Sequence, residues 1–573
     1  MRQKLLCILI SLLTATMAWA ASGNYGTWVV SAPANATVIS IVRTHTGLGL
    51  KDAKTLLQSN TPFYVLQNVT LGEAKAVALE LNDAGATAKV VDMTTDRYVR
   101  LYPREKACYF DEYGAYFGPE EEYLVGATTS QGAYYTGDYT SPFKTYLGKT
   151  DEDIQKKLDQ LWNHYFKGGR DFTVYHENNN EAYILDTGNN DVRSEGMSYG
   201  MMICVQTNHK EEFDKLWEFA KNHMWHKNGQ WDGYFAWHCE PSGVQKDQGC
   251  APDAEMYFMM SLLLAANRWN EPSYMEDAQY ILKKCWKGGL NGGSLFNEQQ
   301  SVITFQPYNC PDFSDPSYDL PSFVDLFARW SNTNKDKWSK AADKTRDHLF
   351  KSSHPTSGLF SDYSNFDGTP HHADFNSNST KYMYDAMRCA MNFGMDYYLF
   401  GADTERQTTM AKRIIDFFEA DGYQHGRFNW DGSNPSDYYT LGETGCNAVA
   451  CYALMDVRGY DEIIKKNLQN AWDARSAQSQ GLLTSQYRYY DGLLHYLSML
   501  HLCGAFKIWK NMSEEIPLDY DVNNDGHVNV ADVVNMVKLV KNNQYAMKYD
   551  FVDDGKLDSK DVDSAAKYVL KKK

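Results

Sequence analysis

Paired helical segments between residues 152 and 506 constrain the fold of this chain more than any other feature. Apolar residues recur there at helical spacing, and the loops between pairs are rich in Gly, Pro, Asn and aromatic residues. The predicted helices are 152–166, 194–206, 209–224, 253–269, 272–286, 321–333, 335–350, 380–400, 403–420, 441–454, 460–473 and 489–506. Six helical hairpins in one domain, at 136–510, favour a mainly α fold with six inner and six outer helices. A helical-repeat binding scaffold is the competing interpretation, although no fixed repeat period is visible.

Three carboxylates occupy similar settings in this helical array. Glu195 and Asp253 each lie in the first turn of a predicted helix, and Asp385 lies in the helix predicted at 380–400. A single carboxylate at such a position is usually a helix cap, and Asp253 taken alone fits a cap better than a catalytic group. The three together indicate acid and base catalysis of glycosidic bond hydrolysis.

Composition narrows the class of ligand. The formal net charge of −17 argues against a nucleic acid partner, because binding of phosphates needs clustered Lys and Arg. The chain has 40 Tyr and 14 Trp, whose flat faces suit sugar rings in a polar cleft, although such residues are more often core. No segment after residue 20 is long and apolar enough for a membrane helix, so we expect no membrane contact.

The helical region resembles glycoside hydrolase family 8. The motifs that carry this resemblance are Ser194–Gly200, Asp232–Trp237, Ala251–Asp253, Asp315–Tyr318, Tyr384–Arg388 and Arg488–Leu494. Within the family they are most similar to the branch that releases xylose from the reducing end of β-1,4-xylo-oligosaccharides. The resemblance implies an (α/α)6 barrel, inversion at the anomeric carbon, and catalysis without a cofactor.

The resemblance also assigns roles to the three carboxylates. Glu195 is the expected general acid, Asp385 the general base that activates water, and Asp253 a residue that helps hold the distorted sugar. Inversion requires the carboxyl groups of Glu195 and Asp385 to lie roughly 6.5–9.5 Å apart. A general acid must be protonated when substrate binds, whereas a helix N-terminus favours the carboxylate. We therefore expect burial, or a nearby carboxylate such as Asp253, to raise the pKa of Glu195.

Six further residues are predicted to contact the substrate. The aromatic residues expected against sugar rings are Trp231, Trp237, Tyr318 and Tyr384, and Asp232 and Arg388 are expected to hold hydroxyl groups or water. Core packing explains each aromatic residue equally well when it is taken alone.

Helical spacing adds a prediction about the region around the general base. It places Asp385, Arg388, Asn392 and Asp396 on one face of the predicted 380–400 helix, as the lining of a wet cleft. An intrahelical ion pair between Asp385 and Arg388 is the alternative.

The N-terminal region is predicted to contain a signal segment and a small domain. Residues 1–20 combine basic residues, a short apolar run and the small-x-small sequence Ala18-Trp19-Ala20, so we expect an exported protein, periplasmic or extracellular. Residues 25–94 are predicted as an α/β unit, with strands at 36–42 and 86–91 and helices opening near 46–54 and at 72–84. Through Thr46–Lys54 and Ala84–Ala86 this unit resembles the C-terminal domain of the ribosomal stalk protein. Residues 95–135 are interpreted as a linker.

Residues 517–573 carry two candidate calcium loops. The first has oxygen ligands at the spacing of an EF-hand-like loop, with Gly526 at its sixth position. Its predicted ligands are Asp521, Asn523, Asp525, His527, Asn529 and Asp532. The second keeps Asp550, Asp554, Asp558 and Asp561, but Val552 replaces a ligand, so we expect weaker binding. Two such loops, each followed by a helix, resemble a type I dockerin, which implies a cohesin-like protein partner.

Three alternatives to the xylose-releasing enzyme stay open. An endo-acting family 8 xylanase or β-glucanase would need an open groove, whereas an exo-acting enzyme needs one closed end, for instance by His425 and Asn429. A chitosanase would suit an acidic protein and a cationic polymer. A non-catalytic carbohydrate-binding scaffold would use the same cleft without turnover.

Overall fold

The computed structural model contains two compact units, which are described separately. One spans Thr129–Met455 and Tyr460–Glu514, and the other holds the remaining residues. The structure describes residues 23–59, 62–99, 109–110, 116–117, 132–168, 173–287, 293–475, 488–510, 522, 528, 530–541, 549, 551 and 559–571. The predicted signal segment at 1–20 lies outside these residues.

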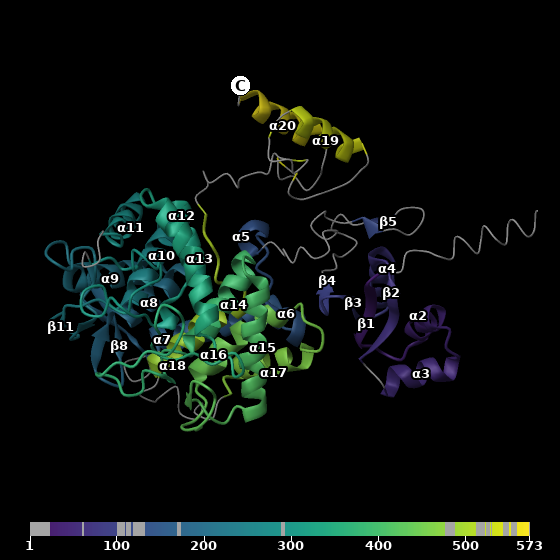
Figure 1. The fold of residues 1–573 in the computed structure, drawn as a ribbon, viewed down its shortest axis with the longest axis horizontal. Helices are drawn as coiled ribbons and strands as arrows, with labels where there is room; N and C mark the ends of the chain where they lie inside the picture. Colours follow the sequence, from purple (N-terminus) through teal and green to yellow (C-terminus); the bar gives the residue numbers. More distant parts are fainter. Residues whose placement is uncertain are drawn as a thin grey trace, which may run out of the picture. The chain divides into compact units, whose positions relative to one another are not determined.

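The larger unit is the predicted (α/α)6 barrel (Figure 1). Among the described residues, six helices buried on nearly all sides form the inner ring: α8 (Ser194–Thr207), α10 (Pro252–Trp269), α12 (Pro321–Trp330), α14 (Arg388–Phe400), α16 (Leu441–Ala450) and α18 (Tyr490–Leu502). The outer helices in the same described part are α7 (Asp151–Lys167), α9 (Lys210–Phe219), α11 (Pro272–Lys284), α13 (Lys335–Ser352), α15 (Thr404–Asp421) and α17 (Asp461–Asp473). Short helices precede or extend them: α5 (Ala133–Thr136), α6 (Pro142–Leu147), η2 (Ala220–Met224), η3 (Pro316–Tyr318) and η4 (Cys451–Leu454).

The inner helices close into a ring. Contacts join α8 to α10, α12 to α14, α14 to α16, α16 to α18 and α18 back to α8. The step from α10 to α12 is made by the rings of Tyr257 and Phe323, whose centroids lie 5.0 Å apart. A Cβ atom at Gly394 would lie 2.4 Å from the carbonyl oxygen of Val449, so only glycine allows α14 and α16 to pack this closely.

Short strands lie at the ends of the barrel helices and position two of them. A five-stranded sheet has the order β11-β10-β9-β8-β7. Its strands are β7 (Tyr175–Asn178), β8 (Glu181–Asp186), β9 (Asp191–Arg193), β10 (His238–Cys239) and β11 (Gln245–Asp247). Strand β9 runs directly into α8, and β12 (Lys381–Tyr382), paired with β13 (Phe428–Asn429), precedes α14.

The predicted helix at 380–400 begins eight residues later than expected. Residues 383–387 form a turn, because one carboxylate oxygen of Asp362 accepts hydrogen bonds from the backbone N–H groups of Met383 and Ala386, both at 3.1 Å. Asp385 therefore lies in this turn and not within a helix.

The smaller unit begins with an α/β fold. Its antiparallel sheet has the order β2-β1-β3-β4. The elements are β1 (Tyr25–Ser31), α2 (Ala36–Thr46), α3 (Leu50–Ser59), β2 (Phe63–Val69), α4 (Leu71–Asp83), β3 (Thr87–Asp92) and β4 (Arg97–Val99). Strand β4 belongs to this sheet, so the small domain extends past residue 94 into the segment predicted as a linker. Two short paired strands follow, β5 (Tyr109–Phe110) and β6 (Tyr116–Phe117).

The predicted strand at 36–42 is wrong, since these residues begin helix α2. The side chain of Asn35 caps the helix by accepting a hydrogen bond from Val38 N at 2.9 Å. The buried residues Val38, Ile39, Ile41 and Val42 recur at helical spacing, which outweighs the strand preference of β-branched residues.

Two helices follow the candidate calcium loops, α19 (Val530–Lys541) and α20 (Ser559–Lys571). They pack around a small apolar cluster of Val522, Met536, Tyr549, Phe551 and Ala565. No helix in the described part of the chain meets the length and hydropathy needed to cross a bilayer.

A buried ion-pair network ties four barrel helices together. Arg346 on α13 donates to both carboxylate oxygens of Asp396 on α14, each at 2.8 Å. Ser322 on α12 and Gln407 on α15 also donate to Asp396, at 3.1 and 2.6 Å. Asn392 on α14 donates to two backbone carbonyls. The predicted cleft lining is therefore wrong for Asn392 and Asp396, which are buried in packing.

We expect Asp396→Ala to lower the free energy of unfolding of the barrel by about 3 kcal/mol, because it removes both hydrogen bonds between the buried Arg346 and Asp396 and leaves Asp325 as the described carboxylate partner of Arg346. Denaturant titration with fluorescence detection measures this loss. The control Lys351→Ala removes an exposed pair with Asp347 and should cost at most about 0.5 kcal/mol. Equal losses in the two variants would contradict the assigned role of the network.

Candidate active site

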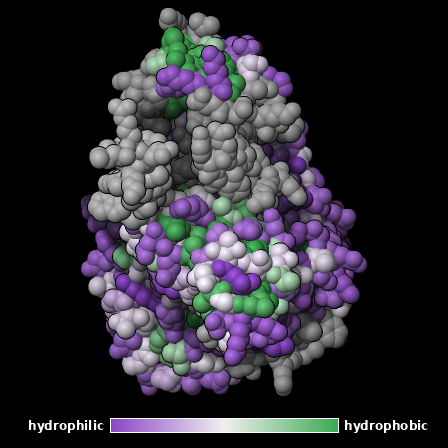
Figure 2. All heavy atoms as spheres, turned by 90° about the vertical axis from the view of Figure 1, so that its right-hand side faces the viewer, coloured by the Kyte–Doolittle hydropathy of each residue, from purple (hydrophilic) through white to green (hydrophobic). Residues whose placement is uncertain are grey.

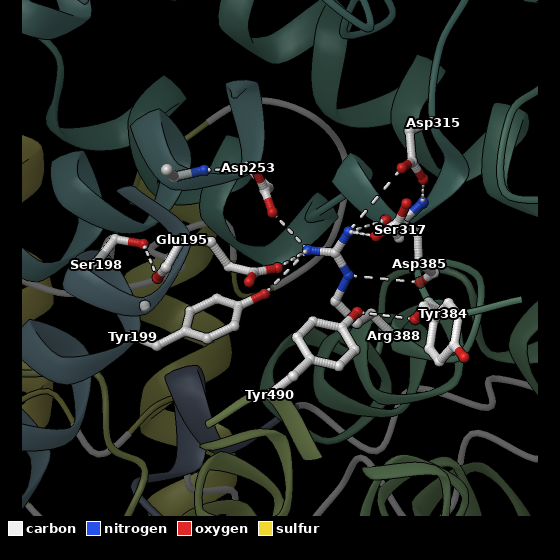
Figure 3. Close-up of polar contacts among 12 residues, drawn as sticks. Glu195, Ser198, Tyr199, Asp253, Asp315, Ser317, Tyr384, Asp385, Arg388 and Tyr490 are labelled. Carbon is white, nitrogen blue, oxygen red and sulfur yellow. Dashed lines mark hydrogen bonds and ion pairs between the residues drawn. The ribbon is translucent and has the colours of Figure 1, made fainter. Parts of the chain in front are cut away.

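The guanidinium of Arg388 lies at the centre of the candidate site (Figure 3). Its Nη1 donates to Asp253 at 2.5 Å, to the Tyr199 hydroxyl at 3.0 Å and to Glu195 at 3.3 Å. Its Nη2 donates to Asp385 at 2.9 Å. The side chain of Arg388 is only 3% exposed, so one buried cation contacts all three predicted catalytic carboxylates.

Strand β9 and the closing helix of the barrel fix Glu195. The N–H of Ser194, the residue between β9 and Glu195, donates to the carbonyl of Trp237 at 3.0 Å. From the start of α18, the Tyr489 hydroxyl donates to Glu195 at 3.2 Å and accepts from the N–H of Gly196 at 3.1 Å. A Cβ atom at Gly196 would lie 2.3 Å from the Tyr489 ring, so this contact requires glycine. The first and the last inner helices, α8 and α18, thus fix the position of Glu195 together.

The turn before α14 presents Asp385 to solvent. Its side chain is 33% exposed, the most exposed of the three carboxylates. Asp362 fixes the turn by accepting hydrogen bonds from two of its N–H groups. The Tyr490 hydroxyl donates to the carbonyl of Tyr384 at 2.8 Å. Asp385 can therefore meet a water molecule while its backbone stays fixed.

Burial and the closeness of other carboxylates raise the pKa values of several acidic groups in the cluster. Burial raises the pKa of Glu195 to about 8, and the charges of Asp253 and Asp385 raise it against the opposing effect of Arg388. Burial likewise raises the pKa values of Asp315 and Asp362 well above their usual range, with Asp385 as the next cause. One guanidinium cannot balance so many carboxylates, so Glu195 is held protonated near neutral pH.

The guanidinium also limits the distance between the candidate acid and base. Glu195 and Asp385 lie on opposite sides of it, bound to different terminal nitrogens (Figure 3). With 3.3 and 2.9 Å to the two nitrogens, which are themselves about 2.3 Å apart, the bound oxygens are at most about 8.5 Å apart. This upper limit leaves room for the roughly 6.5–9.5 Å separation that inversion requires.

The predicted substrate contacts fall into two groups. Tyr318 and Tyr384 lie at the cluster: the Tyr318 ring is 5.7 Å from the Arg388 guanidinium carbon, and Tyr384 is 51% exposed with Arg427 stacked on it at 3.9 Å. The other three, Trp231, Asp232 and Trp237, make their described contacts outside this cluster.

Those other residues belong to neighbouring segments. Asp232 binds Lys284 at 2.5 Å and Tyr280 at 2.6 Å, and the Trp231 ring packs edge-on against Tyr308. Trp237 supplies the backbone carbonyl that holds the start of α8, and its ring lies 5.8 Å from the Arg193 guanidinium. Their direct contact with a sugar stays a prediction.

Sequence reasoning missed several residues of the cluster. Tyr199, Ser317, Asp315 and Tyr489 all lie in segments that carry the family resemblance, yet no helical spacing singles them out. Ser317 accepts from Arg388 Nη2 at 2.7 Å, and Asp315 lies 3.9 Å from the same nitrogen. Closure of the ring brings Tyr199, Ser317 and Asp315 to Arg388, and Tyr489 to Glu195.

The described residues also bear on the calcium loops. Asp532 and Asp561, the last predicted ligand of each loop, are buried in the first turns of α19 and α20. The other predicted ligands, Asp521, Asn523, Asp525, His527, Asn529, Asp550, Asp554 and Asp558, lie outside the described residues. Within the described part, His, Cys, Asp and Glu do not form a group able to hold a metal ion.

This chain belongs to glycoside hydrolase family 8. Residues 176–503 match the family described as glycosyl hydrolases family 8, so the protein is a glycoside hydrolase of a family that needs no catalytic cofactor. Residues 30–91 match the ribosomal protein L7/L12 C-terminal domain, which confirms the resemblance predicted for the N-terminal unit.

Similar proteins of the family include exo-oligoxylanases and an endoglucanase. A reducing-end xylose-releasing exo-oligoxylanase, Rex8A from Paenibacillus barcinonensis, is 36% identical over 392 residues, which cover 66% of this chain and 99% of that protein. Its structure with xylose has a TM-score of 0.61 and covers the same share of this chain. A family 8 xylobiose complex from Teredinibacter turnerae is 36% identical, with a TM-score of 0.61 over 66% of this chain and 100% of that one. Endoglucanase 2 from Ruminiclostridium josui is 25% identical over 366 residues, 61% of this chain and 72% of that protein.

The pKa of Glu195 predicts the pH dependence of catalysis. A general acid works only while protonated, so kcat/KM should fall as the pH rises through about 8. The charge of Asp253 raises this pKa, so Asp253→Asn should move the alkaline limb to lower pH, in addition to any loss of rate. The control Asp347→Asn, on outer helix α13, should leave the limb in place. If the alkaline limb of the kcat/KM profile stayed in place or moved to higher pH in Asp253→Asn, the limb would not report the pKa of Glu195.

Proposed function

We propose that this protein is an inverting glycosidase that releases xylose from the reducing end of β-1,4-xylo-oligosaccharides. The observation that carries the proposal is the pair of carboxyl groups, Glu195 and Asp385, bound to opposite nitrogens of Arg388. The choice of substrate is supported by the similar proteins named as reducing-end xylose-releasing enzymes.

The proposed reaction uses the two carboxyl groups in opposite states. Glu195, neutral and buried, donates its proton to the glycosidic oxygen as the bond to the anomeric carbon breaks. Asp385, ionised and partly exposed, accepts a proton from the water that attacks that carbon from the opposite face. The glycone leaves with a new α-anomeric hydroxyl, and the reducing-end xylose leaves as the alcohol.

Arg388 and Asp253 support this chemistry without exchanging protons. Arg388 fixes the positions of the two carboxyl groups relative to each other and keeps its positive charge. Asp253, fixed by Arg388 and by the N–H of Ala254 at 2.9 Å, keeps negative charge near Glu195 and would bind a ring hydroxyl of the distorted sugar.

Digestion of xylotriose labelled with ¹³C at the reducing-end anomeric carbon tests this proposal. We expect the label to appear in free xylose, and the unlabelled xylobiose to appear first as the α-anomer by NMR. Both Glu195→Ala and Asp385→Asn should lower kcat by at least about 10³-fold while the circular dichroism spectrum is retained. Label retained in xylobiose, early cleavage of xylohexaose at internal bonds without release of xylose, cleavage of chitosan instead, or binding without turnover would each refute the proposal.

We also propose that residues 517–573 form a calcium-binding dockerin of an exported protein. Support comes from the two helices that pack as a pair after the loops, and from the buried Asp532 and Asp561. Helix α19 exposes Val530, Val534 and Val537, which recur at helical spacing on one face. Figure 2 shows an apolar area at its top, where Figure 1 draws α19 and α20. An apolar face of this kind on a small unit fits a protein partner of the cohesin type.

Calcium titration tests this second proposal. Stepwise addition of Ca²⁺ to the calcium-stripped protein should raise the melting temperature of the transition that belongs to residues 517–573, since the ion binds the folded loops. Asp521→Ala should remove most of the effect, whereas Asp550→Ala should remove less, because Val552 already weakens the second loop. No stabilisation by calcium would refute a dockerin.

A further inference from the structure

An exposed phenylalanine lies near the base side of the active site. Phe375 has 63% of its surface exposed, the largest exposed fraction among the exposed large apolar side chains of the described residues. A single exposed apolar residue ordinarily needs no explanation. Its loop and its aromatic neighbours distinguish Phe375 from such a residue.

The loop that carries Phe375 is held by a network of hydrogen bonds. The N–H of Asn376 donates to the carbonyl of Ala373 at 2.9 Å, which closes a tight turn around Phe375. The N–H of Ser379 donates to the carbonyl of Asn376 at 3.1 Å, and the Ser379 hydroxyl accepts from the N–H of Ala373 at 3.0 Å. The ring is therefore presented on an ordered turn, which lowers the entropy cost of binding a ligand there.

A continuous series of rings connects Phe375 to the catalytic cluster. The centroids of Phe375 and Phe305 are 5.8 Å apart, and those of Phe305 and Tyr318 are 6.1 Å apart with nearly parallel planes. Tyr318 in turn lies 5.7 Å from the guanidinium carbon of Arg388. Aromatic contact thus extends from the protein surface to the centre of the site.

A second contact places Phe375 on the side of the general base. Its ring lies 5.9 Å from that of Tyr363, whose side chain is hydrogen-bonded to Asn376. Burial and the charge of Asp385 raise the pKa of Tyr363, so these two groups are close enough to interact. Tyr363 therefore links Phe375 to Asp385, the proposed base.

We propose that Phe375 is the platform of a remote subsite, which binds a xylosyl residue on the glycone side of the cleavage point. The exposed part of the ring packs against the apolar face of the sugar, while contacts with Phe305 and Tyr363 hold the ring in place. The inference rests on the proposed function, because for an enzyme that removes the reducing-end residue all added chain length lies on the glycone side.

The test compares kcat/KM for xylotriose and xylohexaose. Phe375→Ala should lower the value for xylohexaose by roughly tenfold, equivalent to about 1.4 kcal/mol, through a higher KM, and leave the value for xylotriose unchanged. Phe375→Trp should restore the preference for the longer substrate. The control Val244→Ala, which removes a similarly exposed apolar side chain from the turn between β10 and β11, should change neither value.

Calorimetry with xylohexaose in a Glu195→Gln background separates failure of the subsite from failure of the proposed reaction. Weaker binding on addition of Phe375→Ala supports the subsite whichever bond the wild-type enzyme cleaves. Equal losses of kcat/KM for both substrates would indicate a structural role and overturn the inference, as would unchanged kinetics and binding. The labelled xylotriose digestion of the wild type reports on the reaction independently.

Discussion

The ion pairs of Arg388 are the interaction on which the active site depends. A guanidinium buried this deeply is stable only if negative groups compensate it, and here Asp253 and Asp385 do so from two segments of the chain. The neutral carboxyl group of Glu195, from a third segment, accepts a further hydrogen bond from the guanidinium. The barrel makes this possible, because α8, α10 and α14 all begin at the same end of the inner ring. Side chains at or just before these helix starts bind the Arg388 guanidinium, and the guanidinium in turn fixes the relative positions of the helix starts.

The same crowding assigns different chemistry to similar side chains. Glu195 occupies the first turn of a helix, where the dipole favours its carboxylate, yet burial and its acidic neighbours raise its pKa to about 8. Asp385 is reached by solvent and lies outside the helix. Environment, and not residue type, therefore distinguishes the proposed acid from the proposed base. Asp362 fixes Asp385 by holding the turn that carries it, and Tyr489 fixes Glu195 by a direct hydrogen bond.

Much of this organisation could be predicted from the sequence, and the exceptions have physical causes. Helical periodicity predicted the paired helices of the barrel. The motifs predicted that Glu195, Asp253, Asp385 and Arg388 belong to one site, and the structure brings these four residues into contact. Local patterns failed where a tertiary or capping contact decided the structure: Asp362 holds residues 383–387 in a turn, and Asn35 caps a helix made of strand-favouring residues. The contact of Tyr489 with Glu195 joins residues 294 positions apart, and only closure of the ring brings them together. Asn392 and Asp396 share a face with Arg388, but neighbouring helices bury them.

The central claim is that Glu195 is a neutral acid beside a permanent cation. The direct measurement is a ¹³C NMR titration of the protein labelled at the glutamate side-chain carboxyl carbon, with the Glu195 signal assigned by its loss in Glu195→Gln. The structure predicts a midpoint near pH 8 for this signal. A midpoint near the ordinary glutamate value of about 4.3 would show that Arg388 keeps Glu195 ionised, and would contradict its role as the proton donor.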